Sequence, residues 1–114
     1  MTSATPASVD LKKIRGDAKC PMELIPVVAS TELARSLQEG ANKYGPYNWR
    51  ASGIMATTYV AAMMRHLDAW RAGQDIDPDS GRSHLGHIMA NCAIVLDAIA
   101  CGRFNDNRYK DVTP

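Results

Sequence analysis

The sequence lacks the features of a secreted or membrane-spanning protein. Its three cysteines, Cys20, Cys92 and Cys101, are an odd number without CxxC spacing, which is untypical of a disulfide framework and favours a reducing compartment. Residues 1–10 have no positively charged start, and no apolar stretch reaches the roughly 18 residues that a membrane span requires. We therefore expect a cytoplasmic protein without a signal peptide or a membrane-spanning helix.

An excess of charge of either sign is also lacking. The chain has 13 lysines and arginines against 12 acidic residues, so its formal net charge is only +1. Proteins that bind nucleic acid usually carry a basic patch or an overall basic charge. We expect no nucleic-acid partner, and any bound anion must be neutralised by a few local cations.

Strand-like alternation and internal repeats are absent as well, and apolar residues instead recur at helical spacing in three segments. Helix-capping residues and glycines mark the ends of these segments. The pattern predicts an all-α fold, a small bundle of about three main helices. The predicted helices begin at Ser30 or Thr31, at Thr57 or Thr58 and after Ser83, and they end at Gly45, at Gly73 and near Ala100.

The domain organisation expected from this pattern is simple. We predict a disordered N-terminus at 1–10, a single helical domain at 11–104 and a loose tail at 105–114. Within the domain, residues 11–29 read as an irregular N-terminal arm laid over the core. The second predicted helix has an apolar arc wide enough for contacts on two sides, and a chain of 114 residues buries a limited fraction of its surface. A homo-oligomer, dimer or tetramer, is therefore expected to complete the bundle.

Polar residues that could carry chemistry gather in the second and third predicted helices. A short connection makes the two helices antiparallel neighbours, which places His66 at the level of His84, His87 and Asn91. The connection contains Asp75, Asp77 and Asp79 and would arch over them. Carboxylates and imidazoles together suit a metal site or acid–base catalysis, and the start of the third helix offers unpaired N–H groups to a phosphate. Hydrogen-bonded core histidines under a solvated turn are the alternative interpretation.

A second dense stretch, residues 43–50, reads Lys-Tyr-Gly-Pro-Tyr-Asn-Trp-Arg. Its aromatic rings could stack on a base, while Lys43 and Arg50 could contact phosphates. The alternative is that Tyr44 and Trp49 anchor the turn in the core and that both cations are solvated. The sequence leaves the two interpretations open.

Both stretches resemble the small phage proteins known as dATP/dGTP diphosphohydrolases, which are grouped near the all-α nucleotide pyrophosphohydrolases of the MazG type. The strings Lys-Tyr-Gly-x-x-Asn-Trp-Arg and Asp-x-Asp-x-Asp-Ser-Gly-x-x-His-Leu-x-His carry this resemblance, which covers about residues 12–98. Classical members of the wider group carry glutamates on the two helices that here carry His66, His84 and His87. Imidazole suits Zn, Mn, Fe or Ni, whereas Mg²⁺ prefers oxygen ligands.

The resemblance implies hydrolysis of purine deoxynucleoside triphosphates to a monophosphate and pyrophosphate, with Mg²⁺ or Mn²⁺ as the cofactor. A nucleotide- or metal-binding protein without turnover is the alternative function. The expected catalytic residues are His66, Asp79, His84 and His87, and the expected metal ligands are Asp75, Asp77, Asp79 and His84. Residues expected to bind the substrate are Lys19, Lys43, Tyr44, Asn48, Trp49, Arg50, Arg65 and Asn91.

Overall fold

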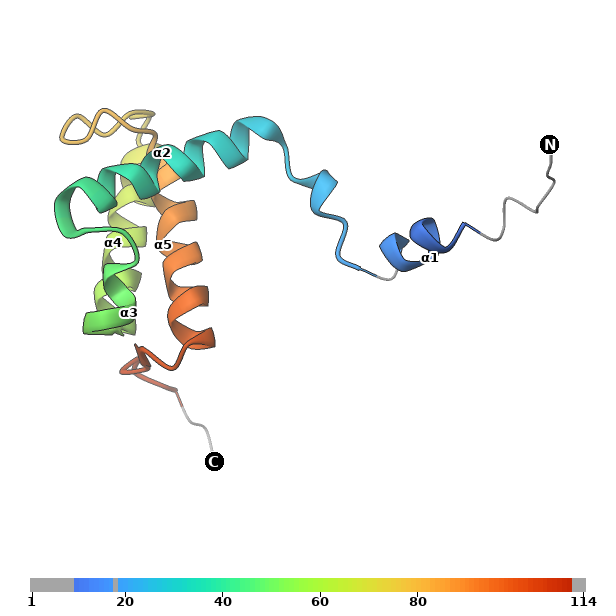
Figure 1. Cartoon of the computed structure of the whole chain (residues 1–114). Coiled ribbons are helices and arrows are strands. Elements are labelled where there is room, and N and C mark those ends of the chain that lie inside the picture. The colour runs from blue at the N-terminus through green and yellow to red at the C-terminus, as the bar shows by residue number, and fades with distance from the viewer. Residues whose placement is uncertain (1–9, 18, 112–114) are drawn as a thin grey trace.

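The computed structural model describes residues 10–17 and 19–111 and confirms the all-α fold with three main helices (Figure 1). The main helices are α2, Val27–Tyr44, α4, Ala56–Arg71, and α5, His84–Ala100. The shorter elements are α1, Leu11–Asp17, the 3-10 helix η2, Met22–Leu24, helix α3, Asn48–Ser52, and the strands β1, Ile54–Met55, and β2, Phe104–Asn105.

The predicted start of α5 is confirmed, whereas the predicted start of α2 is wrong by about one turn. The Ser83 hydroxyl accepts hydrogen bonds from the backbone N–H groups of Leu85 and Gly86, so Ser83 caps α5 as predicted. Helix α2 begins at Val27, one turn earlier than predicted, because Pro26 occupies its N-cap and accepts the N–H groups of Ala29 and Ser30. Proline suits a helix start, where its missing N–H removes no helical bond.

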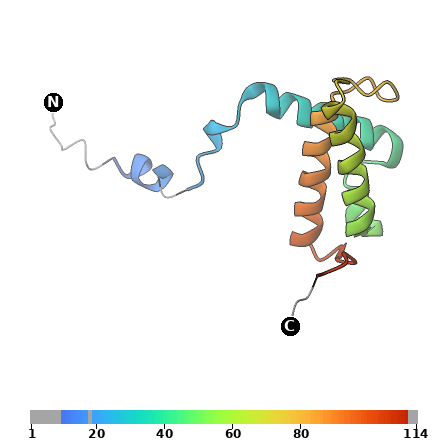
Figure 2. The same ribbon diagram turned by 180° about the vertical axis from the view of Figure 1, so that it is seen from behind.

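Helices α4 and α5 lie side by side and antiparallel, and α2 crosses one face of this hairpin (Figure 1, and from behind Figure 2). Among the described residues, the buried hydrophobic ones are small alanines, Ala56, Ala90 and Ala98. Gly86 lies where α2 and α5 cross, and a Cβ placed there would lie 2.8 Å from Ser36 Oγ and 3.1 Å from the carbonyl oxygen of Glu32. The two helices therefore approach too closely for a side chain at this position.

Two short strands form a parallel pair that was not predicted. Ile54 pairs with Phe104 and Met55 with Asn105, which joins the start of α4 to the end of α5. With two residues each, these strands are too short to show an alternating pattern. Beyond them, the Asn107 side chain accepts a hydrogen bond from Thr57 N and donates one to its hydroxyl, so the start of the predicted tail is attached to α4. Residues 1–9 and 112–114 of the predicted disordered and loose ends lie outside the described residues.

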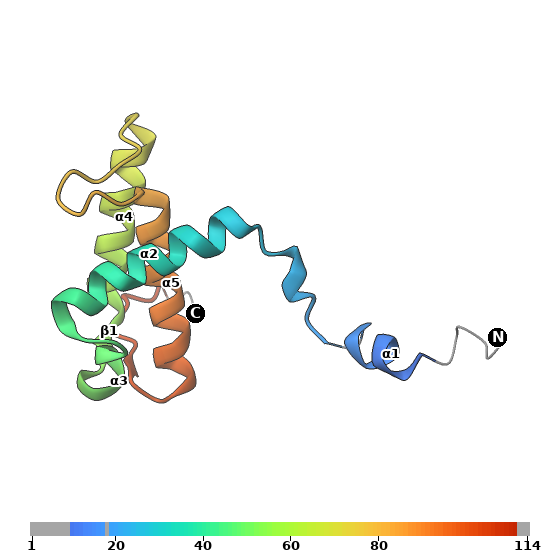
Figure 3. The same ribbon diagram turned by 45° about the horizontal axis from the view of Figure 1, so that its top comes forward.

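The N-terminal arm differs from the expectation. It contains α1 and η2, and it extends away from the three main helices instead of lying over the core (Figures 1 and 3). Its apolar side chains are consequently exposed, as Met22 and Leu24 show at 67% and 74%. Among the described residues, no helix is both long and apolar enough to cross a membrane.

Candidate functional site

The three histidines of the chain meet between α4 and α5. The Nδ1 atoms of His66 and His84 are 2.8 Å apart, and the rings of His66 and His87 stack with their centroids 4.6 Å apart. His66 lies on α4 and the other two on α5, so the predicted antiparallel hairpin does bring them together. His84 is only 4% exposed, whereas His66 and His87 are half-buried.

Residues of the α4–α5 connection form hydrogen bonds with the Nε2 atoms of His84 and His87. His84 Nε2 lies 2.7 Å from the Gln74 amide oxygen, and His87 Nε2 lies 2.7 Å from the Ser80 hydroxyl. Asp77 Oδ2 lies 3.7 Å from His87 Nε2, and its other oxygen accepts the N–H of Asp79 in a tight turn. Gln74 and Ser80 were not predicted as site residues. Gln74 has no sequence pattern of its own, whereas Ser80 stands in the Asp-x-Asp-x-Asp-Ser-Gly string.

The cluster favours neutral His66 and His87 side chains beside an ionised Asp77. Burial lowers the pKa of His66 and of His87, and for His66 the two neighbouring imidazoles lower it further. Burial by itself would raise the pKa of Asp77. The N–H of Asp79 and the three imidazoles outweigh that effect, so the pKa of Asp77 is lowered.

The start of α5 does not offer the phosphate site that the sequence suggested. The N–H of His84 donates to the carbonyl of Asp75, and that of His87 donates to the carbonyl of Ser83. The intervening N–H groups bind the Ser83 hydroxyl. The N–H groups of the first four helical residues are thus bonded inside the protein, and none of these is left for an anion.

A group of residues that could hold a metal ion does exist here, and its membership is only partly as predicted. One potential ligand atom each from His66, Asp77 and His84 lies within 4.8 Å of the others. Two of the predicted ligands, Asp77 and His84, belong to this group. Asp75 and Asp79 do not belong to it. They contribute backbone groups instead: the Asp75 carbonyl accepts the N–H of His84, and the Asp79 N–H donates to Asp77. Both of their side chains are exposed.

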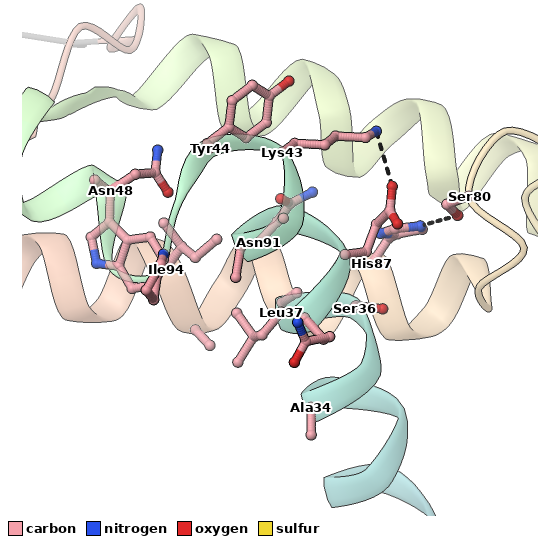
Figure 4. Close-up of a pocket in the computed structure, with 18 of the residues that line it drawn as sticks. Ala34, Ser36, Leu37, Lys43, Tyr44, Asn48, Ser80, His87, Asn91 and Ile94 are labelled. Carbon is pink, nitrogen blue, oxygen red and sulfur yellow. Dashed lines mark hydrogen bonds and ion pairs between the residues drawn. The ribbon is translucent and has the colours of Figure 1, made fainter.

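A cavity of about 730 Å³ runs from this cluster along α2 and α5 to the turn before α3 (Figure 4). This volume lies within the usual range for small-molecule sites. His66, His87, Asp77, Asp79 and Ser80 line one end, and the middle is formed by side chains such as Leu37, Asn91 and Ile94. Tyr44, Asn48 and Trp49 line the other end. The two stretches singled out in the sequence thus open into one space.

The aromatic end is held in place by Asp97 of α5, which the sequence did not single out. Asp97 accepts the indole N–H of Trp49 at 2.6 Å and two guanidinium N–H groups of Arg50 at 2.8 Å each. These bonds lower the pKa of Asp97 to about 2, with Arg50 as the larger cause. Tyr47 has a left-handed backbone, φ 55°, uncommon outside glycine, and its ring lies 4.4 Å from the Arg50 guanidinium. Arg50 therefore braces the turn.

Lys43, which lines the cavity, forms an exposed ion pair. Its ammonium lies 3.1 Å from a carboxylate oxygen of Glu39, one turn earlier on α2, and this hydrogen bond raises the pKa of Lys43 (Figure 4). Glu39 is a further cavity residue that the sequence analysis missed. Its only signal is the helical spacing that places it on the face of Lys43.

The remaining predicted residues divide by location. Tyr44, Asn48, Trp49 and Asn91 line the cavity. Tyr44 is 71% exposed, so it is not the core anchor of the alternative interpretation, whereas Trp49 is half-buried and bonded to α5. Three predicted substrate-binding residues do not line the cavity. Lys19 lies in the arm, Arg50 is hydrogen-bonded to Asp97, and Arg65 lies at an exposed position of α4.

These features define a small helical protein with a histidine–aspartate cluster at one end of a ligand-sized cavity. The family of dATP/dGTP diphosphohydrolase N-terminal domains matches residues 10–108, and the chain belongs to this family. It is also 30% identical over 78 residues to a dATP/dGTP diphosphohydrolase of Salmonella phage PMBT28. That match covers 68% of this chain and 26% of the relative, so the chain spans about a quarter of the relative's length. No solved structure matches the chain.

Proposed function

We propose that this protein hydrolyses purine deoxynucleoside triphosphates to a monophosphate and pyrophosphate with the help of a divalent metal. The observation that carries this proposal is the single cavity with two chemically different ends. One end has the carboxylates and imidazoles that phosphoryl chemistry needs, and the other has the aromatic and amide side chains that suit a base. The name of the phage relative supports the choice of substrate.

From the two ends of the cavity we infer one orientation for the substrate. The triphosphate would lie at the end formed by Asp77, Asp79 and His87, where Lys43 supplies a positive charge. The base would lie against Trp49, within reach of the Asn48 amide, with Tyr44 at the same end and Asn91 along the path between the ends. Lys43 would leave Glu39 for a phosphate oxygen, because a helical i,i+4 ion pair at the surface contributes little stability.

A metal ion would neutralise phosphate charge and lower the pKa of a bound water, and Mg²⁺ or Mn²⁺ is the cofactor that the resemblance implies. In the reaction, water oxygen bonds to the α-phosphorus, the bond to the α,β-bridging oxygen breaks, and pyrophosphate leaves. The water proton needs an acceptor, and we assign it to His87. Burial keeps this imidazole neutral near pH 7, and it lines the cavity beside Asp77.

The first experiment is phosphorus NMR of each deoxynucleoside triphosphate with the full chain and Mg²⁺ or Mn²⁺. We expect a monophosphate and pyrophosphate from dATP and dGTP. A diphosphate with inorganic phosphate would contradict the assigned bond cleavage. Nucleotide binding without turnover would instead support the alternative, a binding protein without catalysis, which the absence of glutamate from α4 favours.

A matched pair of variants tests the orientation. Asn48→Ala removes an amide at the proposed base end, and we expect about a tenfold rise in KM, the equivalent of one lost hydrogen bond. Asn42→Ala removes an amide from the same region of the chain that bonds Gln38 and does not line the cavity. Equal KM values in the two variants would place the base elsewhere.

We also propose that the chain works as a homo-oligomer, dimer or tetramer. The face of the α4–α5 hairpin opposite α2 is uncovered (Figure 2). Both helices of the hairpin also carry exposed apolar side chains at helical spacing. On α5, Leu96 and Ile99 are 68% and 54% exposed, and on α4 Met64 and Leu67 are 58% and 50% exposed. None of the larger described side chains is fully buried, so a second copy on this face would add the apolar burial that one chain lacks.

A further inference from the structure

We propose that His66, Asp77 and His84 bind a transition-metal ion of the manganese-to-zinc series and select it over Mg²⁺. This inference deepens the metal requirement of the proposed function, but it concerns binding that can be measured without any nucleotide. It also replaces the predicted set of three aspartates and His84 with two imidazoles and one carboxylate.

The donor atoms decide the class of ion. Mg²⁺ prefers six oxygen ligands in near-ideal octahedral geometry and keeps several waters. Imidazole nitrogen is a good ligand for Mn, Fe, Co, Ni and Zn, and affinity generally rises along this series toward copper. Two of the three grouped residues offer nitrogen, so the group does not fit Mg²⁺ and does fit these ions.

Hydrogen bonding fixes which nitrogen of His84 faces the ion. The Gln74 amide oxygen lies 2.7 Å from His84 Nε2, so this nitrogen carries the hydrogen and donates it. The neutral ring then has its lone pair on Nδ1, the atom that faces His66 at 2.8 Å. Metal-ligating histidines characteristically donate the second ring N–H to an oxygen in this way, which sets the tautomer and the ring orientation.

The two Nδ1 atoms already stand nearly at the separation that one ion requires. Bonds of about 2.0–2.1 Å place two nitrogen ligands of one ion roughly 2.9–3.4 Å apart. In the metal-free protein, one hydrogen between the two nitrogens joins them at 2.8 Å. Binding moves that hydrogen of His66 from Nδ1 to Nε2, so no net proton is released and the rings separate by only a few tenths of an ångström.

The position of the group leaves room for a substrate ligand. His84 is almost fully buried, whereas His66 and Asp77 line the cavity. Three protein ligands leave at least one coordination position open, which is the pattern of catalytic metal sites. Asp77 is held by the N–H of Asp79, so its carboxylate is oriented before the ion arrives.

The test is a titration of the chelator-treated full chain with Co²⁺, followed by the visible absorption of the bound ion and by calorimetry. We expect one Co²⁺ per chain that a large excess of Mg²⁺ does not displace and that Zn²⁺ does. Gln74→Ala removes no ligand, but it removes the hydrogen bond that orients the His84 ring. We therefore expect it to weaken Co²⁺ binding by about 10–100-fold. His84→Ala and Asp77→Asn should weaken it more.

Asp75→Asn is the matched control, because it removes a neighbouring carboxylate while the backbone carbonyl that binds His84 N remains. Its Co²⁺ affinity should equal that of the natural chain, and far-UV circular dichroism verifies that each variant is helical. Displacement of Co²⁺ by Mg²⁺, or an Asp75→Asn loss as large as that of Asp77→Asn, would overturn the inference. Tight Co²⁺ binding without hydrolysis of any nucleotide would contradict the proposed function alone.

Discussion

Replacement of Gly86 by alanine should destabilise the protein, although alanine is normally the better residue inside a helix. The new Cβ would lie 2.8 Å from Ser36 Oγ and 3.1 Å from the carbonyl oxygen of Glu32, closer than such atoms normally approach. The serine hydroxyl can rotate, but the carbonyl belongs to the backbone of α2. The helices must therefore separate by a few tenths of an ångström at their crossing.

The magnitude follows from two opposing effects. Overpacking of a tight contact costs about 1–3 kcal/mol, whereas replacing a mid-helix glycine by alanine gains about 0.5–1 kcal/mol. We expect a net loss of about 0.5–2 kcal/mol, which urea unfolding followed by circular dichroism can resolve. Because His84 and His87 flank the substituted residue, Co²⁺ binding and hydrolysis should weaken as well.

Gly40→Ala is the control, since no atom lies within 4 Å of a Cβ at that position of α2. It should raise the free energy of unfolding by about 0.5–1 kcal/mol. Ser36→Ala should partly rescue Gly86→Ala, because it removes the nearest atom, a buried hydroxyl to which the described residues offer no hydrogen bond. Equal stabilisation by Gly86→Ala and Gly40→Ala would refute the close approach of α2 and α5.

Two further substitutions test the aromatic turn and the oligomer. Asp97→Asn should lower the free energy of unfolding at pH 7, because it removes the charge that holds Arg50. A carboxyl whose pKa is lowered from 3.8 to about 2 stabilises the fold above pH 3.8 and loses this effect as pH falls through 2, so the difference from the natural chain should vanish there. A difference that persists at pH 2 would exclude the charge as its cause. Leu96→Lys should reduce the mass measured by light scattering to that of one chain, whereas Tyr109→Lys, at a 92% exposed position of the C-terminal segment, should not. An unchanged mass for Leu96→Lys would remove the hairpin face from the interface.

Local patterns were enough to predict some parts of the fold. The Ser83 cap, the glycines after the helices and the recurrence of apolar residues identified α4 and α5, because each depends on residues only a few positions apart. The short α4–α5 connection also predicted that His66 would meet His84 and His87. The start of α2 was placed too late, because Ser30 suits a helix cap equally well and only the backbone shows that Pro26 takes that place.

The strand pair and the position of the arm required the structure. A parallel pair of two-residue strands joins positions about 50 residues apart, and neither strand has a pattern of its own. The arm carries apolar residues that suggested a core contact, and such residues show that a surface is to be covered without showing what covers it. In this chain the arm projects away from the helices (Figure 3).

By itself, the sequence determined which residue types could do chemistry and that those on α4 and α5 would share one level, since helical spacing and a short connection leave little freedom. Only the tertiary structure decided how each group is used. In the structure, Arg50 pairs with Asp97 and Lys43 pairs with Glu39. The Gln74 amide orients the His84 ring, and the N–H groups at the start of α5 bond within the protein. Such partnerships depend on side chains that approach within hydrogen-bonding distance from other turns, helices and loops, and spacing along the chain does not specify them.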